Sequence, residues 1–235
     1  MKPYQQVPIQ ECGEPLVPLA DFLVVTPHPY VALGAPYGAR SPYWLRQSVA
    51  AALLEAQQSL QAQRPGWQIQ IFDAYRPLVV QRFMVEHTAQ ELAQHQGLDL
   101  AQATEAEKQA LMDTVHQFWA YPSPNPQTPP PHSTGAAVDL TLVDATGQPV
   151  NMGSPIDEVS ERSHPDFFQR QTDEWSQQVQ RDRGLLRDIM LAAGFQQHPN
   201  EWWHFSQGDQ LWAWLLARST QQPHTARYGS LEPPP

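Results

Sequence analysis

Apolar residues recur at helical spacing in several long stretches of the chain. The clearest stretch has apolar residues at positions 45, 49, 53 and 60 among strong helix formers, and it stops at Arg64-Pro65-Gly66. Pro77 suits the first turn of a second helix, and Gly194 ends another. The pattern predicts helices over residues 43–63, 77–95, 104–119, 174–193 and 211–217.

Shorter stretches alternate between polar and apolar residues, which is typical of strands. Residues 67–72 alternate with period two and lead directly into Asp73-Ala-Tyr-Arg-Pro. In residues 136–143, Val138, Leu140 and Leu142 share one face, so Asp139 is expected to point away from the apolar side. Residues 195–205 are expected to supply a last pair of short strands. Helices separated from short strands predict an α+β fold, in which helices flank a mixed or antiparallel sheet.

The remaining stretches predict how the chain is organised. Residues 1–40 are rich in Pro, Gly and Tyr, and they predict an irregular N-terminal arm with one short strand at residues 22–25. Prolines in residues 121–131 favour an extended loop that leads into His132. A single domain over residues 1–218 is expected, followed by a mobile, Pro-rich tail over residues 219–235.

Composition narrows the functional classes. The formal charge is −10 and the basic residues do not cluster, so neither a nucleic-acid partner nor an anionic membrane surface is expected. The single cysteine, Cys12, cannot form an internal disulfide. The N-terminal segment develops no apolar run of signal-peptide length, so a cytoplasmic location is expected. Chemistry on small molecules or peptides fits this composition best, and it gives no indication of protein partners.

Two pairs of residues, far apart in the sequence, are the candidates for a catalytic site. His132 and Asp139 lie seven residues apart, with Gly135 between them, and Glu201 and His204 follow near the C-terminal end. Two histidines and a carboxylate can hold a zinc ion while they leave one position open for water, and Glu201 is a spare carboxylate that could act as a base. Either pair alone is more typical of ordinary loop or surface residues. Their conjunction predicts a zinc hydrolase.

Four motifs in this order resemble those of the D-alanyl-D-alanine dipeptidases. These belong to the zinc D,D-peptidases, which share a fold with the hedgehog signalling domain. The motifs, which span residues 73–205, are FDAYRP, HSTGAAVDLTL, NMGSPIDEVSERSH and EWWHF. The resemblance implies one zinc ion per chain, held by His132, Asp139 and His204, and it implies Glu201 as the general base. It also implies that Arg76 stabilises the oxyanion that develops opposite the metal.

The resemblance also predicts how a dipeptide is bound. Asp157 is expected to anchor the free ammonium group, which would restrict the enzyme to short substrates. The family's serine two positions before the first metal ligand is Pro130 here, so a substrate-binding hydroxyl is missing, and Ser133 or Ser154 could substitute for it. The expected substrate-binding residues are Asp157, Ser133, Ser154, Tyr75 and Trp203.

The other histidines receive less specific assignments. His164 is expected to have a supporting or structural role, because a fourth protein ligand would displace the catalytic water. No motif surrounds the remaining histidines, and ordinary surface or packing roles are expected for His28, His87, His95, His116, His198 and His224.

The functional hypothesis is a zinc dipeptidase that cleaves D-Ala-D-Ala or a related D,D-dipeptide in cell-wall precursor turnover. Two alternatives stay open at this point. One is a murein D,D-carboxypeptidase or endopeptidase of the same fold. The other is a non-catalytic zinc module that binds a partner, against which the presence of Glu201 argues.

Overall fold

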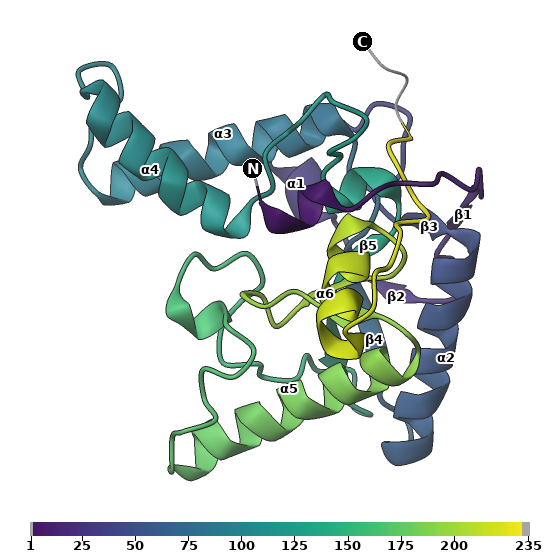
Figure 1. Ribbon diagram of the computed structural model, residues 1–235. Helices are drawn as coiled ribbons and strands as arrows, with labels where there is room; N and C mark the ends of the chain where they lie inside the picture. The colour runs from purple at the N-terminus through teal and green to yellow at the C-terminus, as the bar shows by residue number, and fades with distance from the viewer. Residues whose placement is uncertain (1, 232–235) are drawn as a thin grey trace.

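Residues 2–231 are described in the computed structural model, and they form six α-helices and seven short strands (Figure 1). The helices are α1 (Pro29–Ala32), α2 (Gln47–Gln63), α3 (Leu78–His95), α4 (Glu105–Phe118), α5 (Glu174–Ala192) and α6 (Gln210–Thr220). Three 3₁₀ helices are η1 (Pro3–Gln6), η2 (Pro131–Thr134) and η3 (Glu161–Ser163). The strands are β1 (Leu16–Pro18), β2 (Leu23–Val24), β3 (Trp44–Arg46), β4 (Gln68–Asp73), β5 (Ala137–Val143), β6 (Gln196–Gln197) and β7 (His204–Ser206).

Five of the strands form a mixed sheet in the order β2-β4-β5-β7-β6. The β2–β4 pair is parallel and the other pairs are antiparallel. Strands β1 and β3 form a separate antiparallel pair. This arrangement confirms the predicted α+β class and the mixed sheet.

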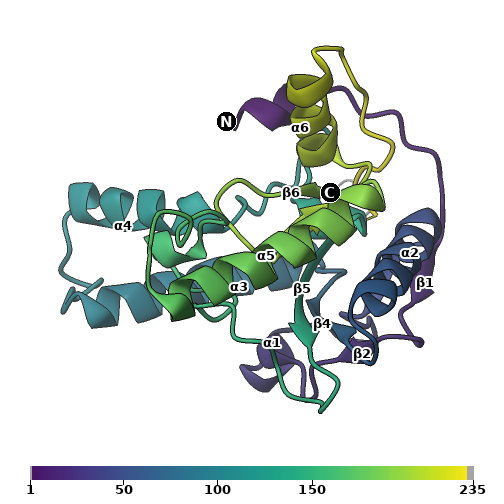
Figure 2. The ribbon, with the colours of Figure 1, turned by 90° about the horizontal axis from the view of Figure 1, so that it is seen from below.

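The main core lies between one face of the sheet and helices α2 and α5 (Figure 2). Val138, Leu140 and Leu142 all face this core and have no exposed surface, as the alternation in their strand predicts. All five predicted helices form. The first is shorter than predicted, because residues 44–46 pair with β1 as strand β3. No helix within residues 2–231 is long and apolar enough to cross a membrane.

A second hydrophobic cluster joins α3 and α4, which form a hairpin that extends to one side of the molecule (Figure 1). Tyr30 from α1 and Trp119, which follows α4, belong to this cluster. Each has less than 5% of its surface exposed. The long connection over residues 86–131 therefore packs its C-terminal end against the body of the protein.

The segment after residue 218 differs from the predicted mobile tail. Helix α6 continues to Thr220, and Ala226 forms a bridge with Ile9 of the N-terminal arm. The ring of Tyr228 packs over Gly208, where a Cβ atom would lie 2.6 Å from it, and its hydroxyl donates to Glu14. Burial of this aromatic ring stabilises a segment whose composition suggests mobility. Residues 232–235 lie outside the described part of the chain.

Replacement of Tyr228 by Ala tests whether this segment is part of the core. The ring is 1% exposed, so its removal is expected to lower the free energy of unfolding by about 3 kcal/mol. Tyr121→Ala is the matched control, because that side chain is 61% exposed and its loss is expected to change stability by less than about 0.5 kcal/mol. Urea unfolding measures both variants, and equal stabilities would contradict the packing described.

Candidate functional site

One row of side chains across three strands forms the base of the site. The register pairs Asp73 of β4 with Asp139 of β5, and Asp139 with His204 of β7. Cross-strand neighbours point to the same face of a sheet, so these three side chains share the face opposite the main core. A register shift between Ile71 and Asp73 allows Ile71 to join the core while Asp73 joins this row.

A short 3₁₀ helix adds His132 to the row. Pro131 begins this helix, and Gly135 ends it in the left-handed region at φ 72°. A Cβ atom at Gly135 would lie 2.4 Å from the side chain of Leu16, so both the backbone conformation and the space require glycine. The turn directs the imidazole of His132 toward the row, and its Nδ1 lies 2.7 Å from the carbonyl oxygen of Ala74.

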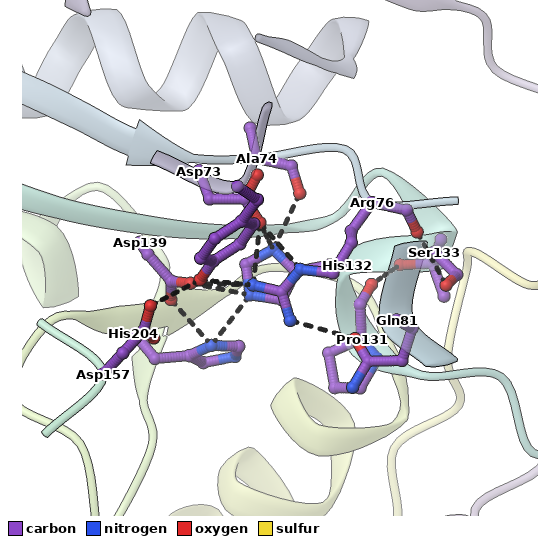
Figure 3. Close-up of polar contacts among 12 residues, drawn as sticks. Asp73, Ala74, Arg76, Gln81, Pro131, His132, Ser133, Asp139, Asp157 and His204 are labelled. Carbon is purple, nitrogen blue, oxygen red and sulfur yellow. Dashed lines mark hydrogen bonds and ion pairs between the residues drawn. The ribbon is translucent and has the colours of Figure 1, made fainter. Parts of the chain in front are cut away.

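His132, Asp139 and His204 converge as a candidate metal centre (Figure 3). One ligand atom from each lies within 4.8 Å of the others, and all three side chains are buried. Nε2 of His132 is 3.2 Å from both Nδ1 of His204 and Oδ2 of Asp139. Nδ1 of His204 is 3.0 Å from Oδ1 of Asp139. The structure therefore brings together the three residues predicted as ligands.

Arg76 lies between the two buried carboxylates of the row. Its Nη2 is 2.7 Å from Asp73 Oδ2 and 3.2 Å from Asp139 Oδ2. Nη1 donates to the side-chain oxygen of Gln81 at 2.9 Å, and the guanidinium lies 4.9 Å from the ring centre of Trp119. Burial alone would lower the pKa of Arg76, but the surrounding acidic groups raise it well above its ordinary value. The guanidinium is therefore charged and fixed on several sides.

Asp73 has further partners that sequence reasoning did not identify. Nε2 of His28 and the hydroxyl of Tyr37 each lie 3.0 Å from its Oδ1. Burial favours the neutral acid, but Arg76 and His28 outweigh it and hold the pKa of Asp73 below its ordinary range. His28 was expected to be an ordinary residue. It is instead 6% exposed and bound to this carboxylate, a contact between residues 45 positions apart that no motif indicates.

Glu201 lies beside the cluster and is also buried. Its Oε2 is 3.6 Å from Nδ1 of His204, and its Oε1 is 3.5 Å from Nδ1 of His198. Oε1 has no hydrogen-bond partner among the described residues. Burial, and then the nearby charge of Asp139, raise the pKa of Glu201 well above its ordinary value. A carboxylate with a high proton affinity thus faces the three clustered residues.

His198 also departs from the ordinary role expected of it. It is 9% exposed and it lines the same cavity as the cluster. Burial, and then the nearby imidazole of His204, lower its pKa well below the ordinary value, so the ring is neutral. It lies three residues before Glu201, and its backbone N–H donates to the carbonyl of His204. His198 therefore packs against the end of the motif that carries the base and the third ligand.

Asp157 and Trp203 lie on the cavity wall, as predicted for substrate-binding residues. The hydroxyl of Tyr30 donates to Asp157 Oδ2 at 2.7 Å, and the backbone of Asp157 is left-handed at φ 67°. Burial, together with the neighbouring charge of Asp139, raises the pKa of Asp157 to about 7. The wall of the cavity therefore carries an acidic group in addition to Asp139 and Glu201.

Three residues predicted to bind substrate do not line this cavity. Ser133 donates to the backbone carbonyl of Arg76 at 2.8 Å. Ser154 accepts from the indole of Trp202 at 3.0 Å, and the hydroxyl of Tyr75 accepts from Arg40 at 3.1 Å. These contacts place all three in the supporting structure, and Ser133 fixes the backbone of the residue that lies between the carboxylates.

Residues far from the motifs complete the wall. Lys2 and Tyr4 come from the N-terminal arm, while Phe118 and Trp119 come from the end of the α3–α4 hairpin. No sequence signal places them there, because their position depends on how distant segments pack. His164, by contrast, is exposed and lies outside both the ligand cluster and this cavity, and Cys12 is exposed as well.

Comparisons with known proteins agree with the motifs. Residues 24–225 match the model of the peptidase M15 family, described as D-ala-D-ala dipeptidase. A D-alanyl-D-alanine dipeptidase of Synechocystis sp. is 50% identical over 99% of this chain and 98% of its own length. Another from Escherichia coli is 33% identical over 61% of this chain and 57% of its own. A solved zinc complex of the vancomycin-resistance D,D-pentapeptidase VanY has 13% identity and a TM-score of 0.47, over 77% of this chain and 81% of that one.

Replacement of Asp73 by Asn tests the role of the carboxylate beneath Arg76. The change leaves the buried guanidinium with one acidic neighbour fewer, so the free energy of unfolding is expected to fall by about 3 kcal/mol. Asp188→Asn is the control, because the side chain of Asp188 is 76% exposed and lies 4.0 Å from its cationic neighbour. Urea denaturation measures both, and a stable Asp73→Asn variant would show that the network does not depend on this charge.

Proposed function

The chain belongs to the family of D-alanyl-D-alanine dipeptidases, and from this premise we propose that it hydrolyses D-Ala-D-Ala, or a close D,D-dipeptide, with the help of zinc. The enzyme is a metallopeptidase by its family. One observation carries the finer proposal: the three clustered residues and Glu201 meet in one buried cavity, although they come from separate segments.

The donor set fits a zinc ion. With its Nδ1–H donated to the carbonyl of Ala74, His132 presents the lone pair of Nε2 to the cluster. His204 presents Nδ1 in the same way, while its Nε2 lies 3.3 Å from the hydroxyl of Ser206. Two imidazole lone pairs and a carboxylate then converge, an arrangement that favours a cation between them. When bound, zinc supplies an acidified water and polarises the scissile carbonyl.

Glu201 serves as the general base in this proposal. Its Oε1 has no hydrogen-bond partner among the described residues. That atom is therefore available to accept a proton from the attacking water. A neighbouring dication favours the ionised carboxylate and so opposes the effect of burial on its pKa. The proton can then pass from Glu201 to the amine that leaves when the C–N bond breaks.

Arg76 stabilises the oxyanion in this proposal. A guanidinium has five N–H groups, and the acceptors around it among the described residues are Asp73, Asp139, Gln81 and Tyr30. One N–H therefore remains for a group in the cavity that Arg76 lines. Because the guanidinium is already fixed, it loses little freedom as the charge develops on the substrate oxygen.

Asp157 accounts for a preference for free dipeptides. Its carboxylate lines the cavity beside Arg76 and is oriented by the hydroxyl of Tyr30. An α-ammonium group would form a charge-assisted hydrogen bond with it, whereas an acylated nitrogen would leave this partly buried carboxylate without a cationic partner. The proposed substrate is therefore a dipeptide with a free N-terminus.

Release of free D-alanine tests this assignment directly. The zinc-loaded protein is incubated with D-Ala-D-Ala, L-Ala-L-Ala and N-acetyl-D-Ala-D-Ala, and the products are quantified by chromatography. Hydrolysis of D-Ala-D-Ala is expected, with N-acetyl-D-Ala-D-Ala cleaved at least about 100-fold more slowly because its nitrogen cannot pair with Asp157. Rapid cleavage of the blocked substrate would instead identify a carboxypeptidase.

Two variants separate metal binding from catalysis. Glu201→Gln is expected to retain zinc and to lower kcat by about 100- to 10,000-fold, because the general base is removed. His132→Ala is expected to lose both zinc and activity. His95→Ala, which changes an exposed histidine at the end of α3, is the control for both readouts. Zinc content after dialysis and D-alanine release are measured, and full turnover by Glu201→Gln would exclude the assigned mechanism.

A further inference from the structure

We propose that Lys2 of the N-terminal arm binds the C-terminal carboxylate of the dipeptide substrate. The inference rests on the proposed function, since it concerns the other end of the molecule whose ammonium group Asp157 would hold. Lys2 is partly buried and lines the same cavity as Arg76, Asp157 and Glu201. It lies 130 residues before the first candidate metal ligand, so no motif points to it.

The arm that carries Lys2 is held in place by helix α6. The side-chain amide of Gln210 donates to the carbonyl of Gln5 at 3.3 Å and to that of Val7 at 2.7 Å. Tyr4 is 6% exposed and also lines the cavity. Figure 2 shows the start of the chain beside α6. The backbone N–H of Lys2 donates to the side-chain oxygen of Gln5 at 2.9 Å. Because Gln210 fixes Gln5 and Val7, the position of Lys2 at the cavity follows from packing.

The charges on the wall favour a role for Lys2 in binding an anion. Lys2 and Arg76 are the two Lys or Arg residues on the described wall. Arg76 already has two carboxylate partners, Asp73 and Asp139. Lys2 lines the cavity together with Glu201, the proposed general base. Among the described side chains of this wall, Lys2 is the cation without a carboxylate ion pair closer than 4 Å, so it would offer a charged donor to the C-terminal carboxylate of a dipeptide.

Asp157 and Lys2 line one cavity, and they would each bind one end of a dipeptide. Asp157 interacts with Tyr30 and Arg76, on the side where the ammonium would lie. Lys2 shares the cavity with Glu201, the residue that would protonate the leaving amine. The leaving nitrogen and the C-terminal carboxylate are attached to the same carbon, so a carboxylate near Lys2 also places that nitrogen near Glu201. Pro130, which stands where the family has a serine, offers no donor for this task.

The test compares Lys2→Met with Lys108→Met on two substrates. The chain has two lysines, and Lys108 is a partly exposed residue of α4 that pairs with Glu105, so both variants lose the same charge. D-Ala-D-Ala has a carboxylate at its C-terminus, whereas D-Ala-D-alaninamide has a neutral amide there. The zinc-loaded protein is prepared without an N-terminal extension, and kcat/KM is measured for each pair.

Lys2→Met is expected to lower kcat/KM for D-Ala-D-Ala by about 10- to 100-fold while it changes the value for the amide by less than about threefold. Lys2→Arg is expected to recover most of the activity on D-Ala-D-Ala, and Lys108→Met to behave as the unchanged protein. Equal losses on both substrates would overturn the proposal, because Lys2 would then act through Glu201. No loss on either would overturn it as well. If the unchanged protein cleaved neither substrate, the proposed function itself would fail.

Discussion

Two carboxylates, Asp73 and Asp139, are buried on adjacent strands, and the structure around the site depends on Arg76 lying between them. Two like charges in a water-poor environment repel each other strongly, so the pair is compatible with the fold only when a cation is shared. The same guanidinium is in turn confined by Gln81, Tyr30 and Trp119. The contacts that orient Arg76 are therefore the same contacts that allow the two carboxylates to be buried.

This network also connects the two hydrophobic clusters. The main core supports the strands from one side, and the α3–α4 hairpin supplies Trp119 from the other. Arg76 stands where they meet, three residues after the end of β4 at Asp73. His132 is fixed relative to it through the carbonyl of Ala74 and through Ser133, whose hydroxyl bonds the Arg76 backbone. The candidate ligands are therefore held by contacts that are formed on folding, before any metal binds.

Local sequence pattern predicted the parts of this site that depend on local geometry. Alternation in residues 136–143 placed Asp139 on the face opposite Leu140, and the motifs identified Glu201 and His204 together. Pattern could not reveal the register that aligns Asp73 with Asp139, because register depends on pairing between strands about 65 residues apart. For the same reason His28 was missed. Ser133 and Ser154 were assigned to substrate from their proximity in sequence, but their hydroxyls satisfy buried groups instead.

The two ends of the described chain are joined beside the cavity. The Ile9–Ala226 bridge links the N-terminal arm to the segment after α6, and Gln210 of α6 holds the end of η1 and the residue that follows it. Buried Tyr228 adds to this contact through Arg46 and Glu14. Composition predicted an irregular N-terminal arm and a mobile tail after residue 218, and it gave no sign that the two pack together. Their mutual packing instead makes the N-terminal arm a fixed part of the cavity wall, so the ends of the chain contribute to the shape of the site as much as its motifs do.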